Sequence, residues 1–85
     1  MNQHYLKLKR ISSVEVFCGT KAEIMTAIGI INSSKGSAMA ELVTATDKLV
    51  KKRIREQKIW GQYYKIPHVT ELNTTTLKHL KREAI

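Results

Sequence analysis

The spacing of apolar residues changes at Thr20, and this change constrains the fold more than any other feature of the sequence. Before Thr20, HYLKLKRI places leucines at alternate positions, and SVEVFC alternates again around Glu15, as half-buried strands do. After Thr20 the apolar residues fall on one stripe of a helix: Ile24, Ala27, Ile28 and Ile31. A chain that carries both periods is expected to form an α+β domain, with a strand or a short irregular lead over residues 1–19.

The first helix is predicted over roughly residues 21–32. Thr20 can cap its N-terminus, because Glu23 follows three residues later in the order of a capping box, and NSSKGS provides the stop. Gly29 inside this helix costs up to about 1 kcal/mol relative to alanine. Two explanations for a glycine at this position stay open: a close packing neighbour at Gly29, or an early end of the helix.

The stretch AMAELVTATDKLVKKRIREQK, residues 38–58, fits two arrangements. A single helix is consistent with one continuous apolar stripe: Met39, Leu42, Val43, Thr46, Leu49, Val50 and Ile54. Two helices broken at TATD are also consistent, because Asp47 or Thr46 is a good N-cap for a helix that begins at Lys48. We favour two helices on this capping chemistry, and the sequence leaves both arrangements open.

The segment KIWGQYYKI, residues 58–66, has β-type residues on both sides of Gly61-Gln62 and predicts a two-residue hairpin turn. Alternation puts two sets of side chains on opposite faces of this hairpin. The expected core face is Ile59, Tyr64 and Ile66, and the expected outer face is Lys58, Trp60, Tyr63 and Lys65. Pro67 ends the second strand, and Asn73 can cap a last helix over TTTLKHLKREAI.

Composition excludes several function classes. The chain has 85 residues, 42% of them hydrophobic, so we expect one small domain with a modest core and no deep enzyme pocket. Its seven carboxylates are scattered without an acid/base pair. The candidate metal ligands lack paired spacing: His4, His68, His79 and Cys18. We therefore predict no catalysis, no metal and no cofactor.

The same composition bears on location. No apolar run reaches the roughly eighteen residues of a membrane span, so no membrane partner is expected. The first thirty residues lack the apolar core of a secretory signal, and Cys18 has no second cysteine for an internal disulfide. These features predict a cytoplasmic protein.

Positive charge is the strongest indication of function. Fifteen Lys and Arg residues against seven acids give a formal charge of +8, which attracts polyanions. On a helix starting at Lys48, one broad face would carry Lys48, Lys51, Lys52, Arg55 and Lys58, opposite Val50 and Ile54. Such a run is most often an ordinary solvated face, but like charges one turn apart cost roughly 0.2–0.5 kcal/mol per pair. A phosphate backbone would supply the missing partner.

The predicted hairpin repeats this charge pattern. Its outer face would set Lys58 directly across from Lys65, beside Trp60 and Tyr63, and like charges in that position are unfavourable without a ligand. Trp60 fits equally well as a lid over the core. For the two lysines we favour contact with nucleic acid, because the helix face and the hairpin face meet at Lys58.

The order of these elements resembles a winged helix-turn-helix DNA-binding domain over roughly residues 20–66. The resemblance runs from the first helix through a KGSAMAELV helix, a short turn and a basic DKLVKKRIREQK helix to the KIWGQYYKI hairpin. GSAMAEL is similar to the second-helix entry of many bacterial winged-helix regulators. IREQKIWGQYYKIP is similar to the recognition-helix end and wing of small phage and plasmid excisionases of the MerR-like class.

This resemblance implies a single domain over residues 1–85, with three helices and a two-stranded β-hairpin wing. A strand segment over residues 1–19 would precede the winged-helix core over 20–66, and a C-terminal helix over 67–85 would follow it. The implied function is sequence-specific binding of double-stranded DNA by a small transcriptional regulator, with the third helix in the major groove. The implied contacts are Lys48, Lys51, Lys52, Arg55, Lys58, Trp60, Tyr63 and Lys65. No small-molecule effector is expected, and a homodimer is left open.

Three other functions are compatible with the sequence. An excisionase-like architectural protein would bind DNA with the same residues. An RNA-bound or ribosome-associated protein would use the same charge without reading a sequence. A protein-interaction module would pair the apolar stripe of one long helix over 38–58 with a partner. Binding to duplex DNA and to structured RNA, compared across a salt series, separates these alternatives.

Overall fold

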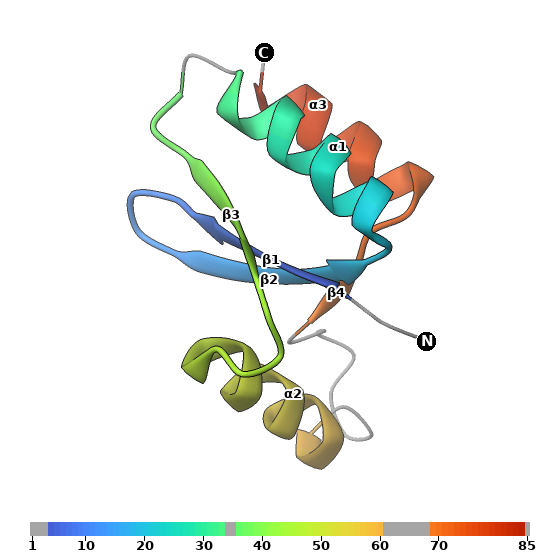
Figure 1. The fold of residues 1–85 in the computed structure, drawn as a ribbon. Coiled ribbons are helices and arrows are strands. Elements are labelled where there is room, and N and C mark those ends of the chain that lie inside the picture. The colour runs from blue at the N-terminus through green and yellow to red at the C-terminus, as the bar shows by residue number, and fades with distance from the viewer. Residues whose placement is uncertain (1–3, 34–35, 61–68, 85) are drawn as a thin grey trace.

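A computed structural model of the chain describes residues 4–33, 36–60 and 69–84, and it shows an α+β domain (Figure 1). Seven elements follow one another: β1 (His4–Lys9), β2 (Val14–Gly19), α1 (Lys21–Asn32), β3 (Met39–Val43), α2 (Lys48–Trp60), β4 (Thr70–Glu71) and α3 (Thr74–Ala84). The α+β class predicted from the two hydrophobic periods is confirmed.

The four strands form a single sheet in the order β3-β1-β2-β4. β1 pairs antiparallel with both β2 and β3, and β2 pairs parallel with β4. The N–H of Arg10 donates to the carbonyl of Ser13 at 2.8 Å and closes the turn between β1 and β2. The N-terminal segment, expected to hold one strand or an irregular lead, therefore supplies both central strands of the sheet.

Helices cover both faces of this sheet. α1 and α3 lie side by side on one face, and α2 lies on the opposite face (Figure 1). The main core lies between the sheet and the helices α1 and α3, and it is formed by Leu6, Leu8, Phe17, Ile24, Ala27, Ile31, Leu72 and Leu80. The strand register explains which strand residues enter this core, because directly paired residues such as Leu6 and Phe17 point to the same face of the sheet.

The prediction for α1 is confirmed, including its cap. The Thr20 hydroxyl accepts the N–H of Glu23 at 3.2 Å, and the Glu23 carboxylate accepts the N–H of Thr20 at 2.9 Å. Gly29 has no heavy atom within 4 Å of the position that a Cβ would take, and the helix continues past it to Asn32. Neither close packing nor an early helix end therefore accounts for this glycine.

The last helix is also confirmed. α3 begins at Thr74, and the side-chain oxygen of Asn73 accepts the N–H of Thr76 at 2.9 Å. Leu80 is buried against α1 and the sheet, as the helical period predicts.

The prediction of a second helix within residues 38–46 is wrong, and so is the alternative prediction of one long helix over 38–58. Met39–Val43 instead form β3, whose Leu42 pairs with Leu6 of β1. Pairing with β1 overrides the helical preference of Met, Ala, Glu and Leu, because it satisfies a row of backbone hydrogen bonds. At this strand the side chain of Asn32 hydrogen-bonds both backbone groups of Ala40, accepting its N–H at 3.2 Å and donating to its carbonyl at 3.4 Å.

The first strand of the predicted hairpin is wrong as well. Lys58–Trp60 form the last turn of α2, and Ile59, expected on the core face, is 49% exposed. The helix of roughly 48–58 continues for these residues because neither glycine nor proline interrupts it before Gly61. The remaining hairpin residues, 61–66, lie outside the described part of the chain. Within the described residues the sheet has four strands, and none of them is a strand of the expected wing.

Candidate nucleic-acid interface

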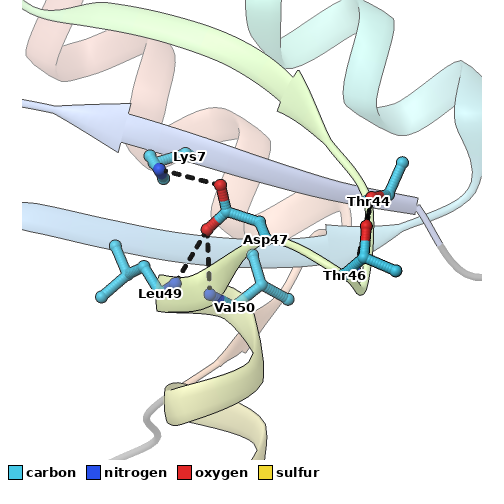
Figure 2. A network of polar contacts seen from close by, with 6 residues as sticks. All are labelled: Lys7, Thr44, Thr46, Asp47, Leu49 and Val50. Atoms are coloured by element: carbon cyan, nitrogen blue, oxygen red, sulfur yellow. Dashed lines mark hydrogen bonds and ion pairs between the residues drawn. The ribbon is translucent and has the colours of Figure 1, made fainter.

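The chemistry at the N-terminus of α2 fixes where this helix begins. One carboxylate oxygen of Asp47 accepts the N–H groups of Leu49 at 2.9 Å and Val50 at 3.2 Å, so of the two predicted candidates, Asp47 and Thr46, Asp47 is the N-cap (Figure 2). The other oxygen forms an ion pair with Nζ of Lys7 at 3.0 Å. Because the hydrogen bond from Lys7 and that from Val50 favour the charged form, the pKa of Asp47 is lowered.

The inner side of α2 attaches this helix to the sheet. Val50 is fully buried, and so is Val16, which pairs with Lys7 across the β1–β2 ladder and therefore faces the same side. Arg53 donates from its guanidinium to the carbonyl of Val14 at 3.2 Å. Gln57 accepts the N–H of Val69 at 3.4 Å. These contacts turn the opposite side of α2 outward.

The outward side of α2 carries a concentrated positive charge. At about 100° per residue, five cations fall within an arc of about 120°. We call these five exposed residues the α2 basic face: Lys48, Lys51, Lys52, Arg55 and Lys58. In the described ranges, none of them forms an ion pair with a carboxylate. Glu56, the one acidic residue of α2, projects about 40° beyond Lys52, so it flanks this face and leaves most of the repulsion within the face unrelieved by the described part of the protein.

Most of the acidic residues are engaged elsewhere in the fold. Arg10 pairs with Glu15 at 2.7 Å and with Glu83 at 2.8 Å. Glu23 belongs to the capping box of α1, and Asp47 caps α2. Four of the seven carboxylates of the chain therefore hold the structure together and do not neutralise the α2 basic face.

The remaining predicted site residues are placed differently. Trp60 is the last residue of α2 and is 45% exposed, but it projects about 120° from Lys48 and so lies beyond the basic arc. Tyr63 and Lys65 lie outside the described residues. Ile59 was assigned to a core, yet it lies within the arc, about 20° from Lys48. Continuing the helical period past Lys58 would have placed Ile59 on this arc.

The weak metal and catalytic candidates are dispersed. Cys18 is buried in β2, and burial, followed by the charges of Glu71 and Glu23, raises the pKa of its thiol. His4 lies on β1 and His79 on α3, and His68 is outside the described residues. Within the ranges that the structure covers, no three His, Cys, Asp or Glu side chains gather as a metal site would require.

Comparison with known proteins does not assign a family. A scan against protein-family models, a search of curated proteins and a search of solved structures each found no match for this chain. The winged-helix resemblance therefore stays a prediction. Among the described residues, no helix has both the length and the apolar character needed to cross a membrane.

Proposed function

We propose that this protein binds double-stranded DNA through the α2 basic face. The observation that carries the proposal is the exposure of five cations on one side of one helix, without carboxylate partners in the described part of the chain. Phosphates would supply the missing negative charge, and release of their condensed counterions would drive binding.

The size and shape of α2 suit the major groove. Thirteen helical residues span about 20 Å, and a groove about 12 Å wide admits a single α-helix. Lys48 and Arg55 lie near the middle of the arc, whereas Lys51 and Lys58 lie on one flank and Lys52 on the other. The flanking lysines are therefore suited to phosphates on the two sides of the groove. Arg55 is the best placed to donate two hydrogen bonds to a guanine edge.

The winged-helix resemblance supplies the finer part of the proposal. α2 would act as the recognition helix, and Tyr63 and Lys65, which follow it in the sequence, would add contacts to the same duplex. The helix that precedes a recognition helix is replaced by β3, so the proposal does not include a helix-turn-helix. A small regulator of this kind would act in the cytoplasm by occupying its site, and a homodimer would double its contacts.

The fold bears differently on the two main alternative functions. An RNA-bound protein would use the same α2 basic face and is distinguished by experiment. The interaction module required one helix over 38–58, which β3 interrupts, so that form of the rival is not proposed.

The test is a gel-shift comparison of duplex DNA with structured RNA across a salt series. Each lysine that meets a phosphate contributes about 0.9 to the slope of log K against log salt, so Lys51→Ala with Lys52→Ala should flatten the DNA slope by about two units. As a charge-matched control, Lys9→Ala with Lys21→Ala removes two exposed cations from β1 and α1 and should leave the slope unchanged. An unaltered slope in the α2 variant, or tight binding of RNA alone, would contradict the proposal.

A further inference from the structure

A second positive surface lies on α3. Lys78, Lys81 and Arg82 are exposed and fall within an arc of about 100°, and we call them the α3 basic face. Leu80 is buried and Leu77 packs against the core, so this face points away from the sheet. The three cations have no carboxylate partner within the described ranges.

The one acidic residue of α3 is held away from this face. Glu83 projects about 100° from Arg82 and about 140° from Lys78, and it forms an ion pair with Arg10 at 2.8 Å. Arg10 also pairs with Glu15 of β2, so the pair anchors α3 to the sheet. The same contact that fixes the orientation of α3 therefore keeps its only carboxylate from neutralising the outward cations.

The two basic faces point in opposite directions. α2 and α3 lie on opposite sides of the sheet (Figure 1). Each buries an apolar residue, Val50 in α2 and Leu80 in α3, and leaves its basic face exposed. The shortest extent of the molecule is 24 Å. A straight duplex lying along α2 cannot reach α3 through this thickness, and the persistence length of DNA, about 150 base pairs, makes bending around so small a body costly.

We infer that a single chain bridges two DNA duplexes, one on the α2 basic face and the other on the α3 basic face. The inference rests on the proposed function, since it requires that the α2 basic face binds DNA. Three cations release fewer counterions than five, so the α3 contact is the weaker of the two. Bridging is therefore expected to disappear as salt rises, at concentrations where binding of one duplex still persists.

The experiment measures capture of a second duplex. A biotinylated duplex is fixed to beads, and the full-length protein is added with a fluorescent duplex of unrelated sequence at about 50 mM salt. The wild-type protein should retain the fluorescent duplex. Lys78→Gln with Lys81→Gln and Arg82→Gln should reduce retention to the level of beads without protein, yet still shift a single duplex in a gel. Lys78→Arg with Lys81→Arg keeps the charge and should retain capture.

The outcomes separate this inference from the proposed function. A wild-type protein that shifts no duplex contradicts both. A protein that shifts one duplex but captures no second duplex contradicts only bridging. Capture that persists in the α3 triple variant also overturns the inference, because two chains joined to each other would then account for it. Circular dichroism of the variants, all altered at exposed positions, confirms that a loss of capture is not a loss of fold.

Discussion

Gly29 lies on the exposed side of α1, and a Cβ added there would meet open space. Its φ is not positive, so alanine can adopt the same backbone conformation. We expect Gly29→Ala to stabilise the protein by up to about 1 kcal/mol, because alanine loses less backbone entropy in a helix. Denaturant unfolding should show a higher midpoint with an unchanged slope. A lower midpoint would contradict the open space around the Cβ position of Gly29.

Gly19 is the opposite case, although it also has no positive φ. A Cβ there would lie 2.9 Å from the Glu23 carboxylate and 3.2 Å from Cβ of Leu72. Leu72 cannot easily move, because its N–H donates to the carbonyl of Cys18 at 2.8 Å and its side chain is in the core. We expect Gly19→Ala to cost about 1–3 kcal/mol, as overpacking does. Gly29→Ala is the matched control in the same unfolding assay, and equal midpoints for the two variants would contradict this explanation.

These glycines show what a sequence reveals at the scale of one residue. The cost of a glycine inside α1 follows from local helix propensity and was predicted. The constraint at Gly19 comes partly from Glu23 of the neighbouring capping box and partly from Leu72, a residue distant in the chain whose approach no local pattern indicates. The predicted caps Thr20, Asp47 and Asn73 are all present, because a cap and the amides it accepts lie within three residues.

At the scale of the element, the N-terminus of α2 depends on one titrating group. The pKa of Asp47 is lowered in the folded protein, so the unfolded chain binds its proton at a higher pH, at an ordinary value of about 4. The stabilisation is therefore complete above that ordinary value and is lost as pH falls through the lower, folded pKa. Trp60, the only tryptophan, reports on this helix from its last position.

We expect acid to loosen α2, seen as a change in Trp60 fluorescence as Asp47 takes up its proton. Asp47→Asn retains a good N-cap but cannot titrate or pair with Lys7 as a charge. The variant should therefore lose stability at neutral pH and lose the part of the acid transition that belongs to Asp47. An identical acid transition in the variant would show that another group controls this end of the helix.

The element that the sequence misassigned is β3. Met39, Leu42 and Val43 fit a helical stripe, and Met39 and Leu42 are 69% and 46% exposed in the strand. A strand with exposed apolar residues on both faces does not show the alternation that identifies a strand in a sequence. The partner that makes it a strand is β1, and this pairing is set by the whole fold. The error at Lys58–Trp60 has a different cause, because β-type residues over three positions cannot be distinguished from a last helical turn.

At the scale of the whole molecule, the two helical layers differ in how firmly they are held. α1 buries three side chains, Ile24, Ala27 and Ile31, whereas α2 buries Val50. Burying an aliphatic side chain contributes roughly 1.5–3 kcal/mol. The α2 layer is therefore expected to open more readily than the layer formed by α1 and α3.

Amide hydrogen exchange tests this difference. Each 1.4 kcal/mol corresponds to a factor of ten, so amides of α2 should exchange at least about tenfold faster than those in the middle of α1. Saturating duplex DNA should slow exchange in α2, and the α2 variant Lys51→Ala with Lys52→Ala should show less slowing. Equal exchange in the two free layers would contradict this assignment of stability.

Charge could be predicted at this scale, but topology could not. The basic helix face was identified correctly as a set of side chains, because the helical period alone places Lys48 and Arg55 together. The sheet order, and with it the placement of α2 and α3 on opposite faces, depends on pairings between distant segments that no local signal encodes. The helical period likewise places Lys78, Lys81 and Arg82 together, but that their face lies opposite the α2 basic face could be recognised only once the layers were known.

The hydrogen bonds of Asn32 affect how this protein behaves at high concentration. Both backbone groups of Ala40 point to the same side of β3, away from β1, and the Asn32 amide occupies them. The row of free donors and acceptors along this edge of β3 is therefore interrupted at Ala40, which disfavours the addition of a strand from another molecule and so disfavours aggregation. Many copies can then come close together at high concentration without joining their sheets into fibres.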